Sequence, residues 1–140
     1  MQFESLHPVG SREWMTDYTR ARRKTSLGRI AMARSNLLAT HGLTLEQYDE
    51  LYQRQRGLCA ICRREMGRAY TAESNGKRGP KPNGAHVDHD HACCPGRTSC
   101  GRCVRGLLCH WCNSGVSMFR DKPELMRLAI EYLERPRGAY

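Results

Sequence analysis

The sequence predicts a small, mainly helical α+β domain in which a strand, a turn and a helix are held together by zinc. Three observations lead to this prediction. Apolar residues recur at helical spacing in several stretches. Two Cys-x-x-Cys pairs stand far apart in the chain, and the 46 residues between them are rich in turn-forming residues. Such a segment leaves little apolar surface to bury, and a structural metal would compensate for so loose a core.

The composition favours a polyanionic partner. Lys and Arg total 23 against 14 Asp and Glu, which gives a net charge of +9. Nucleic acid is the commonest polyanion, although a membrane surface or simple solubility would also fit. No apolar run approaches the length of a bilayer span, and the N-terminus lacks the features of a signal peptide. We therefore expect a cytoplasmic protein whose eight cysteines bind metal instead of forming disulfides.

Residues 1–43 are expected to form a basic N-terminal arm and helix. Residues 1–11 show no periodic pattern, whereas Arg12 to His41 favour helix, with a possible break at Ser26-Leu27-Gly28. From Arg20 to Arg34, six arginines and lysines are interleaved with apolar residues. We expect this helix to lie against a phosphate backbone, and the alternative is a surface helix whose basic face is only solvated.

Residues 44–120 are expected to form the core of the protein. Gly42 is a helix stop, and Thr44-Leu-Glu-Gln47 is a capping box that opens a second helix. The apolar stripe of that helix should face the core, and it consists of Leu45, Tyr48, Leu51 and Tyr52.

A turn-rich loop and a short strand follow. The stretch from Gly67 to Gly84 is too polar to pack, so its Lys77, Arg78 and Lys81 should contact either DNA or water. Ala85 to Asp88 is then expected to be a strand.

The C-terminal part should contain two further helices. One is expected to start at Trp111 or Asn113. The segment 121–140 should form the other, because Pro123 favours a helix start and Pro136 stops it. We expect this last helix to serve for packing or as a dimer contact.

The two Cys-x-x-Cys pairs predict a structural zinc site. Their members are Cys59, Cys62, Cys109 and Cys112. Two pairs of thiolates at this spacing fit a single tetrahedral zinc ion. Such a site would join the strand at Ala85–Asp88 to the helix that begins near Asn113.

A second group of cysteines predicts a further zinc site. Its members are Cys93, Cys94, Cys100 and Cys103. Because adjacent cysteines rarely both bind one ion, the fourth ligand could instead be His91 or His110. Another possible partition would join Cys100 and Cys103 to Cys59 and Cys62.

The segment His86–His91 is the candidate catalytic centre. It holds two carboxylates and three imidazoles within six residues, which indicates a metal-assisted reaction, with a purely structural ion cluster as the alternative. Asp88 offers a hard oxygen and Asn113 a neutral carbonyl oxygen, both suited to Mg²⁺. His89 is the expected general base, and His91 should bind phosphate or orient that base.

This assignment requires an irregular strand. Neighbouring residues on an ideal strand point to opposite faces, which would separate Asp88 from His89. The strand must therefore end, bulge or turn at this position.

At these residues the sequence resembles the phage recombination endonuclease VII family of His-metal-finger, HNH-like nucleases. The resemblance covers Gly42 to about Leu133. The motifs that carry it are Gly-Leu-Thr-Leu-Glu-Gln-Tyr at 42–48, Gln-Arg-Gly-Leu-Cys-Ala-Ile-Cys at 55–62, Val-Asp-His-Asp-His at 87–91, Arg-Gly-Leu-Leu-Cys-His-Trp-Cys-Asn at 105–113 and Ala-Ile-Glu-Tyr-Leu at 129–133. An acidic residue that some members place shortly after the asparagine is absent, which predicts less acidic support for a cation.

The resemblance implies a ββα-metal (His-metal) finger stapled by a four-cysteine zinc, with flanking helices. It also implies a Mg²⁺ ion held by Asp88 and Asn113, with Mn²⁺ as a substitute, a base at His89 and a supporting His91. The expected function is hydrolysis of phosphodiester bonds by a homodimer that cuts branched DNA or Holliday junctions in the cytoplasm of a phage-infected or prophage-bearing cell.

Two other functions stay open. One is an HNH-type nicking or homing endonuclease that acts on ordinary duplex DNA, and the other is a zinc DNA-binding module without activity. A zinc deaminase is excluded, because no histidine in the sequence is followed by x-Glu.

Overall fold

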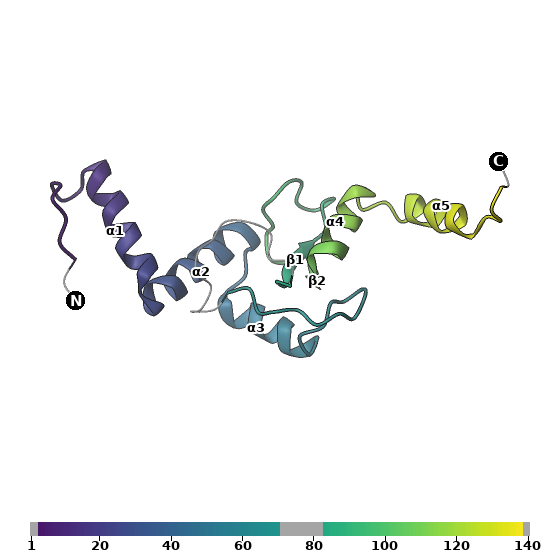
Figure 1. Ribbon diagram of the computed structural model, residues 1–140, viewed down its shortest axis with the longest axis horizontal. Coiled ribbons are helices and arrows are strands. Elements are labelled where there is room, and N and C mark those ends of the chain that lie inside the picture. The colour runs from purple at the N-terminus through teal and green to yellow at the C-terminus, as the bar shows by residue number, and fades with distance from the viewer. Residues whose placement is uncertain (1–2, 71–82, 139–140) are drawn as a thin grey trace.

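The computed structural model describes residues 3–70 and 83–138. The protein is mostly helical with one small sheet, as the sequence predicts. Figure 1 shows α1 and α5 at opposite ends of an elongated molecule, with α3, α4 and the sheet between them. In chain order the elements are α1 (Arg12–Lys24), α2 (Ser26–His41), α3 (Leu45–Arg54), β1 (His86–His89), β2 (Val104–Leu108), α4 (His110–Met118) and α5 (Pro123–Glu134).

The basic N-terminal segment forms two helices, so a break is present, but it lies one residue before the predicted Ser26-Leu27-Gly28. It falls at Thr25, whose extended backbone caps α2 while its hydroxyl accepts a hydrogen bond from the Gly28 N–H at 3.0 Å. Leu37 of α2 is fully buried in the core. No residue of α1 is buried in the described part of the chain, and its Trp14 and Tyr18 rings stack on each other instead. The second helix therefore belongs to the core, and the first extends from it.

Helix α3 begins and packs as predicted. Gly42 ends α2 in the left-handed conformation, and Thr44 and Gln47 form the capping box. The Tyr48 side chain is fully buried, and burial raises its pKa to about 12. Its hydroxyl accepts a hydrogen bond from the Ala69 N–H at 3.1 Å and donates to the Ala85 carbonyl at 3.5 Å. Tyr48 thus connects the segments before and after the turn-rich loop.

Most of that loop lies outside the described residues, including Lys77, Arg78 and Lys81, so its predicted exposure is not tested. Its two ends are adjacent. Gly67 and Gly84 form a parallel bridge, and the Ala85 N–H donates to the Gly67 carbonyl at 2.9 Å. This pairing leads the chain into β1.

Strands β1 and β2 form an antiparallel pair. The expected strand at 85–88 is confirmed within one residue. The second strand, β2, is expected from the ββα finger that the family resemblance implies and not from a residue pattern. Asp88 pairs with Gly106 and His89 with Val104, so the register shifts between Asp88 and His89 and Arg105 has no partner in the ladder. The irregularity that the site requires is therefore present, because a bulge changes the local twist and the direction of side chains.

The core contains residues from α2, α3 and both strands, together with cysteines of the predicted zinc site. Two of its members, Cys59 and Cys109, come from the two Cys-x-x-Cys pairs. The buried residues of this core are Leu37, Leu43, Leu45, Tyr48, Cys59, Met66, Ala85, Val87, Leu107, Leu108 and Cys109. Among the described residues this set is small, which agrees with the expected need for a structural metal.

The two C-terminal helices differ in how they pack. Helix α4 follows Cys109 directly and lies against both strands. Helix α5 begins at Pro123 as predicted, but none of its residues is buried in the described structure. Its Leu128, Tyr132 and Leu133 are 57%, 69% and 79% exposed. The packing role expected for α5 is therefore not seen among the described residues.

In the described residues, no helix combines the length and the apolar character that crossing a membrane requires.

Candidate functional site

The four cysteines of the two Cys-x-x-Cys pairs meet at the edge of the core. They are Cys59, Cys62, Cys109 and Cys112, and their sulfur atoms all lie within 4.8 Å of one another. The Sγ atoms of Cys62 and Cys109 are 3.7 Å apart. A Zn–S bond of about 2.3 Å gives a tetrahedron with an edge of roughly 3.8 Å, so this cluster could hold zinc.

Gln55 fixes the cluster of Cys59, Cys62, Cys109 and Cys112, called the buried cluster below, to the sheet. Its amide nitrogen donates to the carbonyls of Leu58 and Leu107, both at 2.9 Å, and its oxygen accepts the Leu107 N–H at 2.8 Å. The Ala60 N–H adds a bond to the Leu107 carbonyl at 3.1 Å. Burial opposes ionisation of Cys59, but backbone N–H groups such as that of Cys109 lower its pKa to about 6. A thiolate is the form that binds metal.

The second group of cysteines also gathers into one cluster. The Sγ atoms of Cys93 and Cys94 are 3.9 Å apart, those of Cys93 and Cys100 4.0 Å, and those of Cys100 and Cys103 3.7 Å. All four sulfur atoms lie within 4.8 Å of one another. This arrangement favours a four-cysteine site over one that uses His91 or His110. It also keeps Cys100 and Cys103 apart from the buried cluster.

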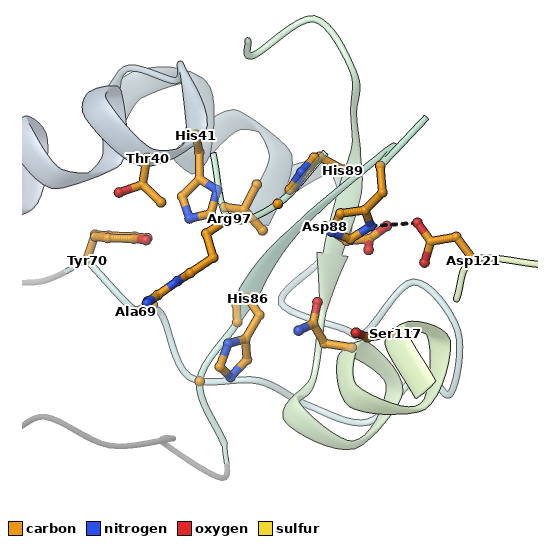
Figure 2. A pocket seen from close by; sticks show the side chains of 16 residues that line it. Thr40, His41, Ala69, Tyr70, His86, Asp88, His89, Arg97, Ser117 and Asp121 are labelled. Atoms are coloured by element: carbon orange, nitrogen blue, oxygen red, sulfur yellow. Dashed lines mark hydrogen bonds and ion pairs between the residues drawn. The ribbon is translucent and has the colours of Figure 1, made fainter. Parts of the chain in front are cut away.

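Asp88, His89 and Asn113 line the same cleft, which has a volume of about 450 Å³. Strand β1 supplies the aspartate and the histidine, and α4 supplies Asn113, whose N–H donates to the Cys109 carbonyl at 2.9 Å. Figure 2 shows Asp88, His89 and Asp121 near one end of the cleft, with His41 and Tyr70 toward the other. The three side chains expected to carry the chemistry are thus neighbours.

Asp88 has a partner that the sequence does not reveal. Its carboxylate is 11% exposed and accepts hydrogen bonds from Arg105, at 2.7 Å from Nε and 3.2 Å from Nη2. These bonds raise the pKa of the Arg105 guanidinium. Each carboxylate oxygen still has a second lone pair, so Asp88 can bind a cation while it holds the arginine.

Asp121 adds a further carboxylate to the cleft, and it follows Asn113 in the chain. It lines the cleft from the turn after α4, and its carboxylate accepts hydrogen bonds from His91 Nδ1 at 2.7 Å and Arg105 Nη2 at 2.9 Å. Burial alone would raise the pKa of Asp121, but these two bonds lower it. Its φ of +55° is unusual for a residue with a side chain, and such backbone strain tends to occur at functional sites. The expectation of less acidic support for a cation stays a prediction, because both bonds of Asp121 are to His91 and Arg105.

His89 is held by the loop of the second cysteine group. Its side chain is buried, and its Nε2 lies 3.1 Å from the Cys94 carbonyl oxygen. A carbonyl oxygen can only accept, so Nε2 is the nitrogen that carries a proton. The Nδ1 of the neutral ring is then left as an acceptor.

Two further residues line the cleft, although no motif in the sequence marks them as site residues. His41, at the end of α2, lies near His89 and His86, and burial followed by the charges of these two rings lowers its pKa. Arg97 enters from the loop between the strands. Both are drawn in Figure 2. They reach the cleft only because α2 and this loop pack together.

The profile of the recombination endonuclease VII family matches residues 34–135. The chain belongs to this family. The matched part includes both cysteine clusters and every candidate site residue described above, and it excludes α1.

The chain is also similar to two phage proteins. It is 39% identical over 103 residues to the Gene 59 protein of Mycobacterium phage D29 and 38% identical over 103 residues to the Gene 59 protein of Mycobacterium phage L5. Each alignment covers 73% of this chain and 50% of the relative, so the chain spans about half the length of the curated relatives that it matches.

Proposed function

We propose that this protein is a metal-dependent DNA endonuclease that hydrolyses phosphodiester bonds and acts on branched DNA, including Holliday junctions. One observation carries the proposal: Asp88, His89 and Asn113, brought together from a strand and a helix, line a single cleft. Membership in the endonuclease VII family supports it. The chain order β1, β2, α4, with β1 and α4 lining this cleft, supports the ββα-metal finger that the family resemblance implies.

Asp88 and Asn113 are the residues that would hold the catalytic cation. A carboxylate and an amide carbonyl are hard oxygen donors of the kind that Mg²⁺ prefers, and Mn²⁺ can take the same ligands. The cleft leaves space for water molecules and a phosphate oxygen to complete the coordination. A cation bound there would stabilise the negative charge that develops on the phosphate and on the leaving oxygen.

His89 would act as the general base. Its free Nδ1 accepts a proton from a water molecule, whose oxygen then bonds to phosphorus while the bond from phosphorus to the leaving oxygen breaks. The hydrogen bond from Nε2 to the Cys94 carbonyl keeps the ring in the tautomer that this step needs.

His91 and Arg97 would contact the DNA phosphate. Asp121 accepts a hydrogen bond from His91 Nδ1 and so orients the ring, and in the imidazolium form the Nε2–H would donate to a phosphate oxygen. Arg97 adds a positive charge at the cleft.

The rest of the chain would supply affinity and assembly. The net charge of +9 suits a phosphate backbone, and α1 carries exposed arginines next to its aromatic stack, with the Arg22 guanidinium 5.7 Å from the centre of the Tyr18 ring. The exposed apolar side chains of α5 suit a homodimer contact. Two active sites held in a dimer would allow paired cuts across a junction.

A cleavage assay tests this proposal. A four-way junction, a linear duplex with the same arm sequences and a supercoiled plasmid are incubated with the protein in Mg²⁺ or in EDTA. We expect cutting of the junction in Mg²⁺ alone, with less cutting of the duplex. Equal cutting of junction and duplex would indicate a nicking or homing enzyme. Binding without any cutting would indicate a zinc DNA-binding module.

A further inference from the structure

The second cysteine group lies directly beside the proposed general base. We propose that Cys93, Cys94, Cys100 and Cys103 hold a zinc ion whose role is to fix the Cys94 carbonyl and, through it, the orientation and tautomer of His89. The inference rests on the proposed function, because it assigns a positioning role toward His89.

The geometry of the four thiols matches a zinc site. Three of their sulfur–sulfur distances are 3.7, 3.9 and 4.0 Å, close to the edge of roughly 3.8 Å in a tetrahedral ZnS₄ centre. Residues 90–103, all of them described, form neither helix nor strand. A loop of this kind has little regular structure to hold four thiols together, and a metal supplies that constraint.

Cys94 links the cluster to the site through two groups of one residue. Its sulfur belongs to the thiol cluster, and its carbonyl oxygen accepts the hydrogen bond from His89 Nε2 at 3.1 Å. The base of the loop is closed by the Asp90 N–H, which donates to the Cys103 carbonyl at 3.0 Å. A metal bond at the sulfur therefore limits the directions in which this carbonyl can point.

The loop is also anchored to the end of α2 by contacts that need no metal. The Ser99 N–H donates to the Thr40 carbonyl and the Ser99 hydroxyl to the His41 carbonyl, both at 2.8 Å. These bonds satisfy carbonyl groups at the helix end. A Cβ atom added at Gly42 would lie 2.6 Å from the Cys100 carbonyl carbon, so the two backbones pack closely.

These anchors explain what loss of the metal would change. The far side of the loop would stay on α2, and the domain would stay folded on its buried cluster. The Cys94 carbonyl would lose the constraint that the metal places on its own side chain, and the His89 ring could then adopt the other tautomer, in which Nδ1 carries the proton and accepts none.

The first test is the zinc content of the purified full chain. We expect two zinc ions per chain in the parent, one in Cys100→Ser/Cys103→Ser, and two in the control Thr98→Ala, which changes an exposed residue of the same loop. One zinc ion in the parent would overturn the proposal. This measurement does not depend on nuclease activity.

The second test is the tautomer of His89, read from the imidazole ¹⁵N resonances at alkaline pH and assigned with His89→Gln. The parent and Thr98→Ala should show the form protonated at Nε2, and Cys100→Ser/Cys103→Ser should show a mixture. An unchanged tautomer in a folded variant that has lost one zinc would overturn the positioning role. If the double variant does not fold, the zinc content and tautomer of the parent still decide the proposal.

The third test is a double-mutant cycle on junction cleavage at saturating DNA. Cys100→Ser/Cys103→Ser should lose at least tenfold in rate, with unchanged DNA affinity in EDTA, and should lose nothing further when combined with His89→Ala. Fully additive losses would show that the loop acts elsewhere and would overturn the proposal. If His89→Ala itself cleaves normally, the proposed function fails at its base, whereas the zinc content and tautomer still report on the loop.

Discussion

The two cysteine clusters have the same four-thiol composition but lie in different surroundings. The buried cluster joins Cys62 to Cys109, which are 47 positions apart, and two of its sulfur-bearing residues belong to the core. The other cluster, called the exposed cluster here, consists of Cys93, Cys94, Cys100 and Cys103 and closes a single loop between residues 93 and 103. Closing a long stretch of chain costs more entropy than closing a short one, so a metal in the buried cluster constrains more of the fold. Sequence separation and burial thus distinguish a folding site from a local one, even when the ligands are the same.

Each cluster also lies next to a different half of the proposed catalytic centre. Asn113 follows Cys112 in α4, so the buried cluster would position a proposed ligand of the cation. His89 bonds to the Cys94 carbonyl, so the exposed cluster would position the proposed base. Substitutions on the two sides should therefore fail in different ways.

The largest effect is expected at the buried cluster. Cys59→Ser or Cys112→Ser should unfold the domain, because a structural zinc contributes about 10–16 kcal/mol of binding energy against a typical domain stability of about 5–15 kcal/mol. Circular dichroism and thermal melting measure this. Cys100→Ser/Cys103→Ser is the matched control and should keep a cooperative melt. A parent-like melt of Cys59→Ser would contradict a folding role for the buried cluster.

The next effect concerns the cation ligands beside the buried cluster. Asp88→Ala and Asn113→Ala should abolish Mg²⁺-dependent cutting yet still bind branched DNA, because affinity comes mainly from phosphate contacts by arginines and lysines. Gel shifts without Mg²⁺ measure the binding. Binding that falls together with activity would mean that these residues belong to the DNA-binding surface.

A smaller loss is expected at the base beside the exposed cluster. His89→Ala should keep its fold and its zinc while cleavage falls by roughly 10²–10⁴, the range for a lost general base. Single-turnover cleavage with metal analysis of the same sample checks both statements. If a folded variant cleaves at a near-parental rate, the base is His91 instead.

Asp121 belongs to neither cluster, so Asp121→Asn should have an intermediate to small effect. We expect about a tenfold loss of cleavage, as for other residues that orient a catalytic group, with little change in melting temperature. Cleavage rates and thermal melts of Asp121→Asn and Asp121→Ala measure it. A rate equal to the parent's would remove Asp121 from the site.

The smallest effect is a pH dependence of stability at His41, whose carbonyl holds the exposed loop through Ser99. The pKa of His41 is lowered in the fold, so the unfolded chain binds more protons as the pH falls below about 6.5. The contribution of His41 to stability is therefore present above that pH and is lost below it. Melting temperatures across this range should fall by a few degrees more for the parent than for His41→Asn. Equal slopes would contradict the predicted dependence.

Features that depend on local sequence could be predicted. The capping box of Thr44 and Gln47, the helix stop at Gly42 and the proline start of α5 each depend on a few neighbouring residues. The gathering of the buried cysteines follows from their spacing. The need for an irregular strand at Asp88 follows from the alternation of side chains, and the shifted register meets it.

Features that depend on the three-dimensional arrangement could not. Arg105 reaches Asp88 because of the shifted strand register, and Asp121 joins them from a turn with left-handed backbone. Gln55 makes its bonds to β2 across 52 positions of sequence. No local pattern encodes these contacts, because each requires two elements to pack first. The exposed apolar face of α5 is a similar case, since helical spacing shows that a face is apolar but not what covers it.

Arg105 has a consequence for the order in which ligands can bind. It lies between the carboxylates of Asp88 and Asp121 and acts as an internal counter-ion for both. Two unpaired carboxylates would repel an approaching phosphate, whereas two that share a guanidinium repel it much less. Under the proposed function, DNA would therefore be able to occupy the cleft before the cation, and the cation would then enter a site whose proposed ligands are already in place.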